Sequence, residues 1–287
     1  MKQDIKSFLD YLAKEKRYSQ NTLAAYNNDL NQLAAYVESQ DSKENTDSSK
    51  ASLNTQLLAS YMQGLSERKY APSTIARKVA AAKSFLKFMV DKGKMRSDQA
   101  PKLTSPQINK PLPKPLSVSE VRRLLSEPAK LSTTEAKRDK TMLELLYATG
   151  LRASELMQLD VDAINLKAGS VYCSDQNSRT RVIPIDQYIT KMIREYIDIV
   201  RPELLRNERE VALFLNQRGE RLTRQGFWQI IQGYADKADI SSKVTPRSLR
   251  HSFAVHKLKG GADLQSVQEL LGHVHISTTK AYKQVKS

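Results

Sequence analysis

The amino-acid sequence predicts a mainly α-helical protein with a small antiparallel β-sheet, divided into two domains. Three observations carry this prediction. Apolar residues recur at helical spacing along most of the chain, two β-rich runs lie close together between residues 170 and 183, and five prolines fall between residues 101 and 115. A chain of 287 residues is long enough for two ordinary domains with separate hydrophobic cores.

The first domain is predicted to be all-helical and to span residues 1–100. Apolar stripes at 3- and 4-residue spacing mark four helices, over residues 5–12, over 23–37, from Thr55 onward, and from Pro72 to Met89. Ser19 to Thr22 offer N-cap side chains for the second helix. Residues 40–51 are rich in Ser, Asp, Lys and Asn, which is typical of a loop.

Basic side chains are concentrated at the end of this domain. Only Asp91 and Asp98 oppose ten cations, namely Arg68, Lys69, Arg77, Lys78, Lys83, Lys87, Lys92, Lys94, Arg96 and Lys102. One interpretation is a phosphate-binding face with salt-dependent affinity, and the other is an ordinary solvated helix face. The formal net charge of +15 favours a polyanionic partner, of which nucleic acid is the commonest.

The prolines indicate an extended linker over residues 101–115, because proline lacks a backbone donor and restricts φ. The second domain is predicted over residues 116–287. Ser117 to Glu120 form a capping-box pattern at the start of its first helix. Asp139 is predicted to cap the next helix, and Gly150 to end it.

The remaining elements follow in order along the second domain. Residues 170–173 and 180–183 predict a β-hairpin joined by a polar turn, and a helix from Asp186 to Val200 is expected to stop at Pro202. Three further helices are predicted around residues 227–234, 244–258 and 264–271.

An ordered set of polar side chains runs through this domain. Arg152 lies in the segment TGLRASEL, Arg250 in TPRSLRH, His273 in LGH, and Tyr282 ends STTKAY. Two guanidiniums match the oxygens of a phosphodiester, and a phenol beside them is a covalent nucleophile for phosphorus. Each residue taken singly is more often a surface or packing residue, but the ordered set favours phosphoryl transfer.

This set resembles the tyrosine recombinase (phage integrase) family, and most closely its bacterial Xer branch. The family pattern contains a TGLRxSEL-like stretch, a lysine in a β-hairpin, HxLRH, LGH, and a tyrosine nine positions after the last histidine. Arg152, Arg250, His273 and Tyr282 occupy the corresponding positions. The resemblance covers nearly the whole chain. It implies a helical core-binding (SAM-like) DNA-binding domain, the Pro-rich linker, and a tyrosine recombinase catalytic domain.

The activity implied by the resemblance is site-specific DNA recombination through a 3′-phosphotyrosyl intermediate. Tyr282 would be the nucleophile, Arg152 and Arg250 would hold the phosphate, and His273 would hydrogen-bond the phosphate or assist Tyr282. No cofactor and no metal are implied, because the reverse attack by a 5′-hydroxyl conserves the bond energy. The implied partner is double-stranded DNA, bound by a homo- or hetero-tetramer on paired sites.

Three features depart from the family pattern. Arg247 replaces the first histidine of HxLRH, where it is expected to donate to phosphate but not to act as a base. Gln176 stands at the lysine position, and a neutral amide cannot protonate a leaving oxygen. After Tyr282 only five residues follow, where Xer-type proteins usually continue into a helix that docks on a neighbouring subunit. Either subunits communicate differently or the sequence is a shortened form.

The departures leave an alternative: a catalytically weakened DNA-binding protein of the same ancestry. A topoisomerase-like nicking-closing enzyme would share the chemistry but lack site specificity. His251 is interpreted as a structural histidine. The single cysteine, Cys173, excludes an internal disulfide, and neither a signal peptide nor a membrane-spanning stretch is recognised, so a cytoplasmic protein that does not contact a membrane is expected.

Overall fold

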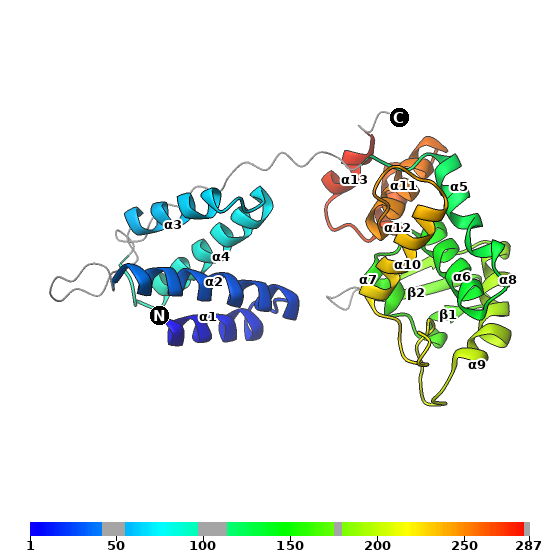
Figure 1. Ribbon diagram of the computed structural model, residues 1–287, viewed down its shortest axis with the longest axis horizontal. Helices are drawn as coiled ribbons and strands as arrows, with labels where there is room; N and C mark the ends of the chain where they lie inside the picture. The colour runs from blue at the N-terminus through cyan, green and yellow to red at the C-terminus, as the bar shows by residue number, and fades with distance from the viewer. Residues whose placement is uncertain (42–54, 97–113, 175–179, 284–287) are drawn as a thin grey trace. The chain divides into compact units, whose positions relative to one another are not determined.

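The computed structural model describes residues 1–41, 55–96, 114–174 and 180–283, and the chain divides into two compact units, Met1–Lys110 and Pro111–Ser287 (Figure 1). The described residues are mainly helical, with one three-stranded antiparallel sheet in the second unit. The predicted fold class is therefore confirmed. The predicted linker lies almost entirely outside the described residues, and the exact domain limits remain a prediction.

The first unit packs helices around a core of its own. Its elements are α1 (Lys2–Lys14), α2 (Gln20–Asp41), α3 (Thr55–Glu67) and α4 (Pro72–Asp91). Ser19 caps α2, because its Oγ accepts the N–H of Thr22 at 3.2 Å. The ring of Phe8 on α1 packs against Phe85 and Phe88 on α4, with centroids 5.6 and 5.4 Å apart. Helical periodicity therefore located these helices correctly.

One residue of the basic run does not lie on the surface. Lys78 is only 4% exposed, and its Nζ donates to Asp29 Oδ1 at 3.0 Å and to Gln32 Oε1 at 2.7 Å. Arg77 also pairs with Asp29. A buried carboxylate needs such partners, so Lys78 stabilises the domain interior and does not belong to a phosphate-binding face. By contrast Arg68, Lys69, Lys87 and Lys92 are exposed.

The second unit surrounds its small sheet with helices (Figure 1). Its main elements, in chain order, are α5 (Val118–Ser126), α6 (Thr134–Thr149), α7 (Ala153–Met157), β1 (Ile164–Asn165), β2 (Ser170–Ser174), β3 (Thr180–Pro184), α8 (Gln187–Glu195), α9 (Arg201–Leu204), α10 (Arg224–Lys237), α11 (Pro246–Lys259), α12 (Leu264–Leu271) and α13 (Ile276–Lys283). The predicted capping box at Ser117 and Glu120 is present. The sheet order is β1-β2-β3, and the predicted hairpin pairs Val171 with Ile183.

Two sequence predictions about helix ends were wrong. Asp139 does not cap α6: Thr133 does, since its Oγ1 accepts from Ala136 N at 3.2 Å. Asp139 lies inside the helix, buried, and accepts hydrogen bonds from Arg138 and from Tyr234. Its carboxylate thus has tertiary partners that local sequence does not reveal.

The chain after α8 also continues past the expected stop at Pro202. One π-helical segment, Tyr196–Val200, leads from α8 into α9, which ends at Leu204. Pro202 directly follows this π-helical segment, whose closing hydrogen bond runs from the Arg201 N–H to the Tyr196 carbonyl oxygen. The helical backbone therefore continues through the proline and ends only at Leu204.

The last three helices assemble beside α6 and the sheet. Helix α11 packs against α6 and α13, and α12 packs against α13 and β3. Phe253, Val267 and Leu271 form a buried apolar cluster with Tyr282. This packing brings the ends of α6, α12 and α13 together. Among the described helices, none is long and apolar enough to cross a membrane.

Candidate active site

Arg152 stands at the N-terminal end of α7, directly after the turn that ends α6. Its Nη1 donates to Glu155 Oε1 at 2.6 Å, and its Nη2 donates to the carbonyl oxygen of Gly272 at 3.1 Å. The side chain is 40% exposed. Arg152 is therefore held in position from two sides while part of its guanidinium still faces solvent.

Arg250 comes from α11 and reaches the same place from the interior. Its Nη1 donates to Gly150 O at 2.7 Å, and its Nη2 donates to Leu271 O at 2.6 Å. Burial, together with the charge of Arg152, lowers the pKa of the Arg250 guanidinium to about 10. Arg250 still carries its charge at neutral pH, so the site contains two neighbouring cations, both close to Glu155.

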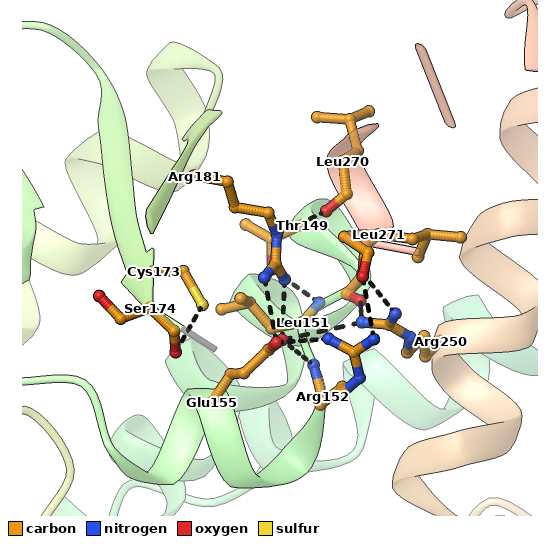
Figure 2. Close-up of polar contacts among 12 residues, drawn as sticks. Thr149, Leu151, Arg152, Glu155, Cys173, Ser174, Arg181, Arg250, Leu270 and Leu271 are labelled. Atoms are coloured by element: carbon orange, nitrogen blue, oxygen red, sulfur yellow. Dashed lines mark hydrogen bonds and ion pairs between the residues drawn. The ribbon is translucent and has the colours of Figure 1, made fainter. Parts of the chain in front are cut away.

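Glu155 is the anion that holds these cations together, as Figure 2 shows. Its two oxygens also accept from Arg181 on β3, at 3.0 and 2.8 Å, and one oxygen lies 3.8 Å from Arg250 Nη1. Burial alone would raise the pKa of Glu155, but the hydrogen bonds from Arg181 and from the Arg152 N–H, with the charges of both arginines, lower it to about 2. One carboxylate against three guanidiniums leaves the cluster cationic.

The sequence does not reveal Arg181 as part of this site. Besides Glu155, Arg181 binds the carbonyl of Leu270 through its Nε at 3.0 Å. Its contact with α12 depends on the packing of β3 against that helix, which no local pattern encodes. Glu155, in contrast, was expected to orient Arg152, and the structure places it in contact.

Two glycines allow the turns that bring these groups together. Gly150 ends α6 with φ of 63°, and a Cβ there would meet the ring of Phe253 at 2.3 Å. Gly272 ends α12 with φ of 62°, and a Cβ there would lie 3.0 Å from the Arg181 guanidinium. Both positions combine a left-handed backbone with close packing, so only glycine fits without strain.

His273 follows Gly272 and connects Arg250 with α13. Its Nε2 lies 3.2 Å from Arg250 Nη2, and its Nδ1 lies 2.9 Å from the hydroxyl of Thr279. Burial and the neighbouring charge of Arg250 lower the pKa of His273 to about 4. The imidazole is therefore neutral at physiological pH.

Tyr282 lies between two histidine rings. His273 stacks on it at 6.1 Å between centroids, and His251 meets it edge-on at 5.1 Å. The tyrosine is only 7% exposed. Burial raises the pKa of its hydroxyl, while the charges of Arg250, Arg247 and Arg152 act in the opposite direction. The phenol is therefore neutral and adjacent to the arginine cluster.

Arg247 is exposed on the first turn of α11, and its Nε donates to His251 Nε2 at 3.1 Å. The structure thus gathers all five predicted residues, Arg152, Arg247, Arg250, His273 and Tyr282, around one location. Gln176, at the family's lysine position, lies outside the described residues. Among those described, no group of His, Cys, Asp and Glu side chains could hold a metal ion.

This geometry defines a class of protein. Convergent guanidiniums beside a buried phenol suit a phosphoryl-transfer enzyme with a tyrosine nucleophile, in which the cations stabilise charge that develops on phosphate oxygens. The helical N-terminal unit has a hydrophobic core of its own and is separate from the unit that carries this cluster.

Comparisons with known proteins identify the family. Residues 114–287 match the model of the phage integrase family, and residues 5–93 match the phage integrase N-terminal SAM-like domain. Tyrosine recombinase XerC of Roseiflexus sp. (strain RS-1) is 44% identical over 287 residues, covering 99% of this chain and 90% of that protein. Tyrosine recombinase XerD of Listeria innocua serovar 6a is 39% identical over 282 residues, covering 98% and 93%. The chain belongs to the phage integrase family and is a site-specific tyrosine recombinase of the Xer type, as its sequence predicted.

Solved structures share the fold. The XerH site-specific recombinase bound to its difH substrate superposes with a TM-score of 0.76 at 21% identity, over 97% of this chain and 81% of that one. A lambda integrase (75–356) dimer bound to a COC′ core site also gives 0.76, at 15% identity, over 99% and 95%. At these identities the likeness supports the architecture alone.

Proposed function

We propose that this recombinase cuts and rejoins double-stranded DNA by forming a covalent bond between Tyr282 and a 3′-phosphate. One observation carries the proposal: the buried phenol of Tyr282 stacks on His273, which is itself hydrogen-bonded to the phosphate-binding candidate Arg250. Nucleophile and cations are thus held in one cluster before any substrate arrives. Such preorganisation is the main source of electrostatic catalysis.

In the proposed reaction each side chain has a distinct task. Tyr282 Oη bonds to phosphorus while the bond from phosphorus to the 5′-oxygen breaks, and that oxygen takes up a proton and leaves as a hydroxyl. Arg152 and Arg250 bind the non-bridging oxygens, and the exposed Arg247 adds a third donor. A 5′-hydroxyl of the second strand then reverses the attack, so the joining step requires no cofactor.

The first domain is proposed to grip the duplex through exposed cations such as Lys87 and Lys92 on α4 and directly after it. Pairs of DNA sites are proposed to be bound by a homo- or hetero-tetramer in the cytoplasm. The structures of XerH and of the lambda integrase contain these proteins bound to DNA sites. Because their fold is shared with this chain, they support a DNA partner.

The test is covalent capture. Nicked duplex fragments of the host genome are incubated with the full chain, denatured, and the protein-bound DNA is recovered and sequenced. The proposal expects one enriched core sequence attached through its 3′-phosphate to the peptide that contains Tyr282. Attachment of the DNA to another residue would contradict the assignment of Tyr282 as the nucleophile. DNA binding without any covalent capture would support the alternative of a catalytically weakened DNA-binding protein.

A further inference from the structure

We infer that Thr279 is a positioning residue that keeps the proton of His273 on Nδ1, so that Nε2 is the atom that accepts the proton of Tyr282. The proton-acceptor part of this inference rests on the proposed phosphotyrosyl chemistry. The positioning part concerns the free protein and stands on hydrogen-bond geometry alone.

The contacts of His273 determine which nitrogen carries its proton. A neutral imidazole has one N–H and one lone pair. Arg250 can only donate, so its Nη2, 3.2 Å away, requires the lone pair to be on Nε2. The proton is then on Nδ1, which donates to Thr279 Oγ1 at 2.9 Å. Both nitrogens have a matched partner in this one tautomer only.

Thr279 is well placed to enforce this choice. It is completely buried, at 0% exposure, so water does not compete for its hydroxyl oxygen. It lies on α13, three residues before Tyr282 and therefore one helical turn from it. The same helix thus carries the nucleophile and the hydroxyl that orients the histidine stacked on it.

The other groups beside Tyr282 are unsuited to accept its proton. His251 already accepts from Arg247 Nε at 3.1 Å through its Nε2. That contact places the His251 proton on Nδ1, which is buried and has no hydrogen-bond partner among the described residues. Arg247 stays protonated and has no acceptor. His273 Nε2 also accepts from an arginine, but its Nδ1 has a partner, Thr279. A proton gained at Nε2 therefore gives an imidazolium whose Nδ1–H is hydrogen-bonded, which His251 cannot provide.

The resulting step balances in atoms and charge. When DNA binds, Arg250 turns a donor toward the phosphate and releases His273 Nε2. The Oη–H bond of Tyr282 breaks and its proton moves to Nε2, the Oη–P bond forms, and the P–O bond to the 5′-oxygen breaks with its electron pair on oxygen. The 5′-oxygen takes its proton from solvent water and leaves hydroxide, whose negative charge balances that of the new imidazolium. The imidazolium keeps its Nδ1–H bond to Thr279 and gains an Nε2–H that faces the phosphate.

The tautomer is measured directly by ¹⁵N NMR of the full chain labelled in histidine. The chain has only four histidines, so His273→Asn assigns the signal. We expect a protonated Nδ1 and an unprotonated Nε2 in the wild type, the same in Thr279→Ser, and loss of this single pattern in Thr279→Val. A wild-type proton on Nε2, or an unchanged pattern in Thr279→Val, overturns the inference. Once the signal is assigned, the wild-type result does not depend on whether the Thr279 variants fold.

Capture rates test the consequence for chemistry. In nicked DNA with sulfur at the 5′-bridging position, the leaving thiolate needs no proton. The rate of covalent capture on this DNA therefore depends on the activation of Tyr282 and not on protonation of the leaving group. Thr279→Val should lower that rate about 10–100-fold, by analogy with the loss of a partner that orients a metal-bound histidine, and Thr279→Ser should retain it. Thr141→Val is the matched control, a buried threonine whose hydroxyl donates to Lys137 O on α6 at 3.0 Å, and it should keep both rate and tautomer.

The two failures are distinguishable. A wild type that never captures DNA refutes the proposed function and leaves the NMR result as evidence on Thr279 alone. A wild type that captures DNA at the same rate as Thr279→Val refutes the positioning inference and leaves the proposed function intact.

Discussion

Arg181 and Glu155 form a bidentate ion pair in which both terminal nitrogens of the arginine donate to the two carboxylate oxygens, at 3.0 and 2.8 Å (Figure 2). The pair joins strand β3 to helix α7, whose N-terminal neighbour is Arg152. Because Glu155 also accepts from Arg152, the hairpin helps to determine where this candidate phosphate ligand lies. A substitution that breaks this ion pair should therefore lower both the stability of the second domain and the rate of covalent capture.

Glu155→Gln should destabilise the second domain by about 3 kcal/mol, because it leaves buried guanidiniums without their anion. Urea denaturation followed by the fluorescence of Trp228, the single tryptophan, measures this in the full chain. Displacement of Arg152 should also slow covalent capture about 10²-fold. Glu208→Gln, at an exposed position, is the control and should change neither quantity. Equal stability of the two variants would contradict the anchoring role of Glu155.

Tyr282→Phe should abolish covalent capture while DNA affinity is preserved, because the change removes one hydroxyl from an otherwise intact core. Denaturing gels measure capture, and fluorescence anisotropy with labelled duplex measures affinity. Capture that persists in this variant would show that another tyrosine is the nucleophile, with Tyr234 and Tyr188 the next to test.

The presence of Gln176 in place of a lysine leads to a prediction about protonation of the leaving 5′-oxygen. General acid assistance contributes typically about 10²–10⁴-fold in rate, so a chain without its lysine should cleave ordinary DNA slowly. Sulfur at the 5′-bridging position should accelerate cleavage strongly, since a thiolate leaves without a proton. Gln176→Lys should speed cleavage of ordinary DNA and reduce the sulfur effect. Fast wild-type cleavage with little gain from sulfur would mean that another residue donates the proton and that the enzyme is not impaired.

Lys87 and Lys78, both on α4, should behave differently. Lys87 is exposed, so Lys87→Gln should reduce the slope of log affinity against log salt by about 0.9 without changing stability, if Lys87 contacts one phosphate. Lys78 is buried against Asp29, so Lys78→Gln should lower the free energy of unfolding by about 3 kcal/mol. Anisotropy titrations at several salt concentrations and urea denaturation separate the two. A large stability loss in Lys87→Gln alone would reverse this assignment.

The histidines of the site predict a loss of stability in acid. Burial lowers the pKa values of His251 and His273 from 6.5 to about 4. Between these values the unfolded chain binds protons that the folded chain does not, so the free energy of unfolding falls as pH is lowered through this window. Glu155, whose pKa is lowered from 4.5 to about 2, adds a further loss below 4.5.

Urea denaturation at pH values from about 7 to about 5, again followed by Trp228, measures the histidine contribution. His251→Asn and His273→Asn should each flatten the pH dependence, whereas His275→Asn, at an exposed position, should not. A pH dependence that is the same in all three variants would contradict the assignment to the buried rings.

Local signals in the sequence were sufficient for most helix ends. Ser117 and Glu120 cap α5, and Gly150 ends α6, because capping involves residues within one turn of each other. The sequence predictions for Asp139 and Lys78 were wrong for the opposite reason. Each looks like a local or surface residue, but its partners, Tyr234 and Asp29, come from other helices.

The sequence by itself determined the family, the two-domain helical class and the five candidate residues, because these depend on residue type and spacing along the chain. Only the tertiary structure decided how those residues are held. Arg181 reaches Glu155 across 26 positions, and His273 lies between Arg250 and Thr279. Such contacts depend on how β3, α11, α12 and α13 pack, and a hydrogen bond is sensitive to a fraction of an ångström that no sequence pattern specifies.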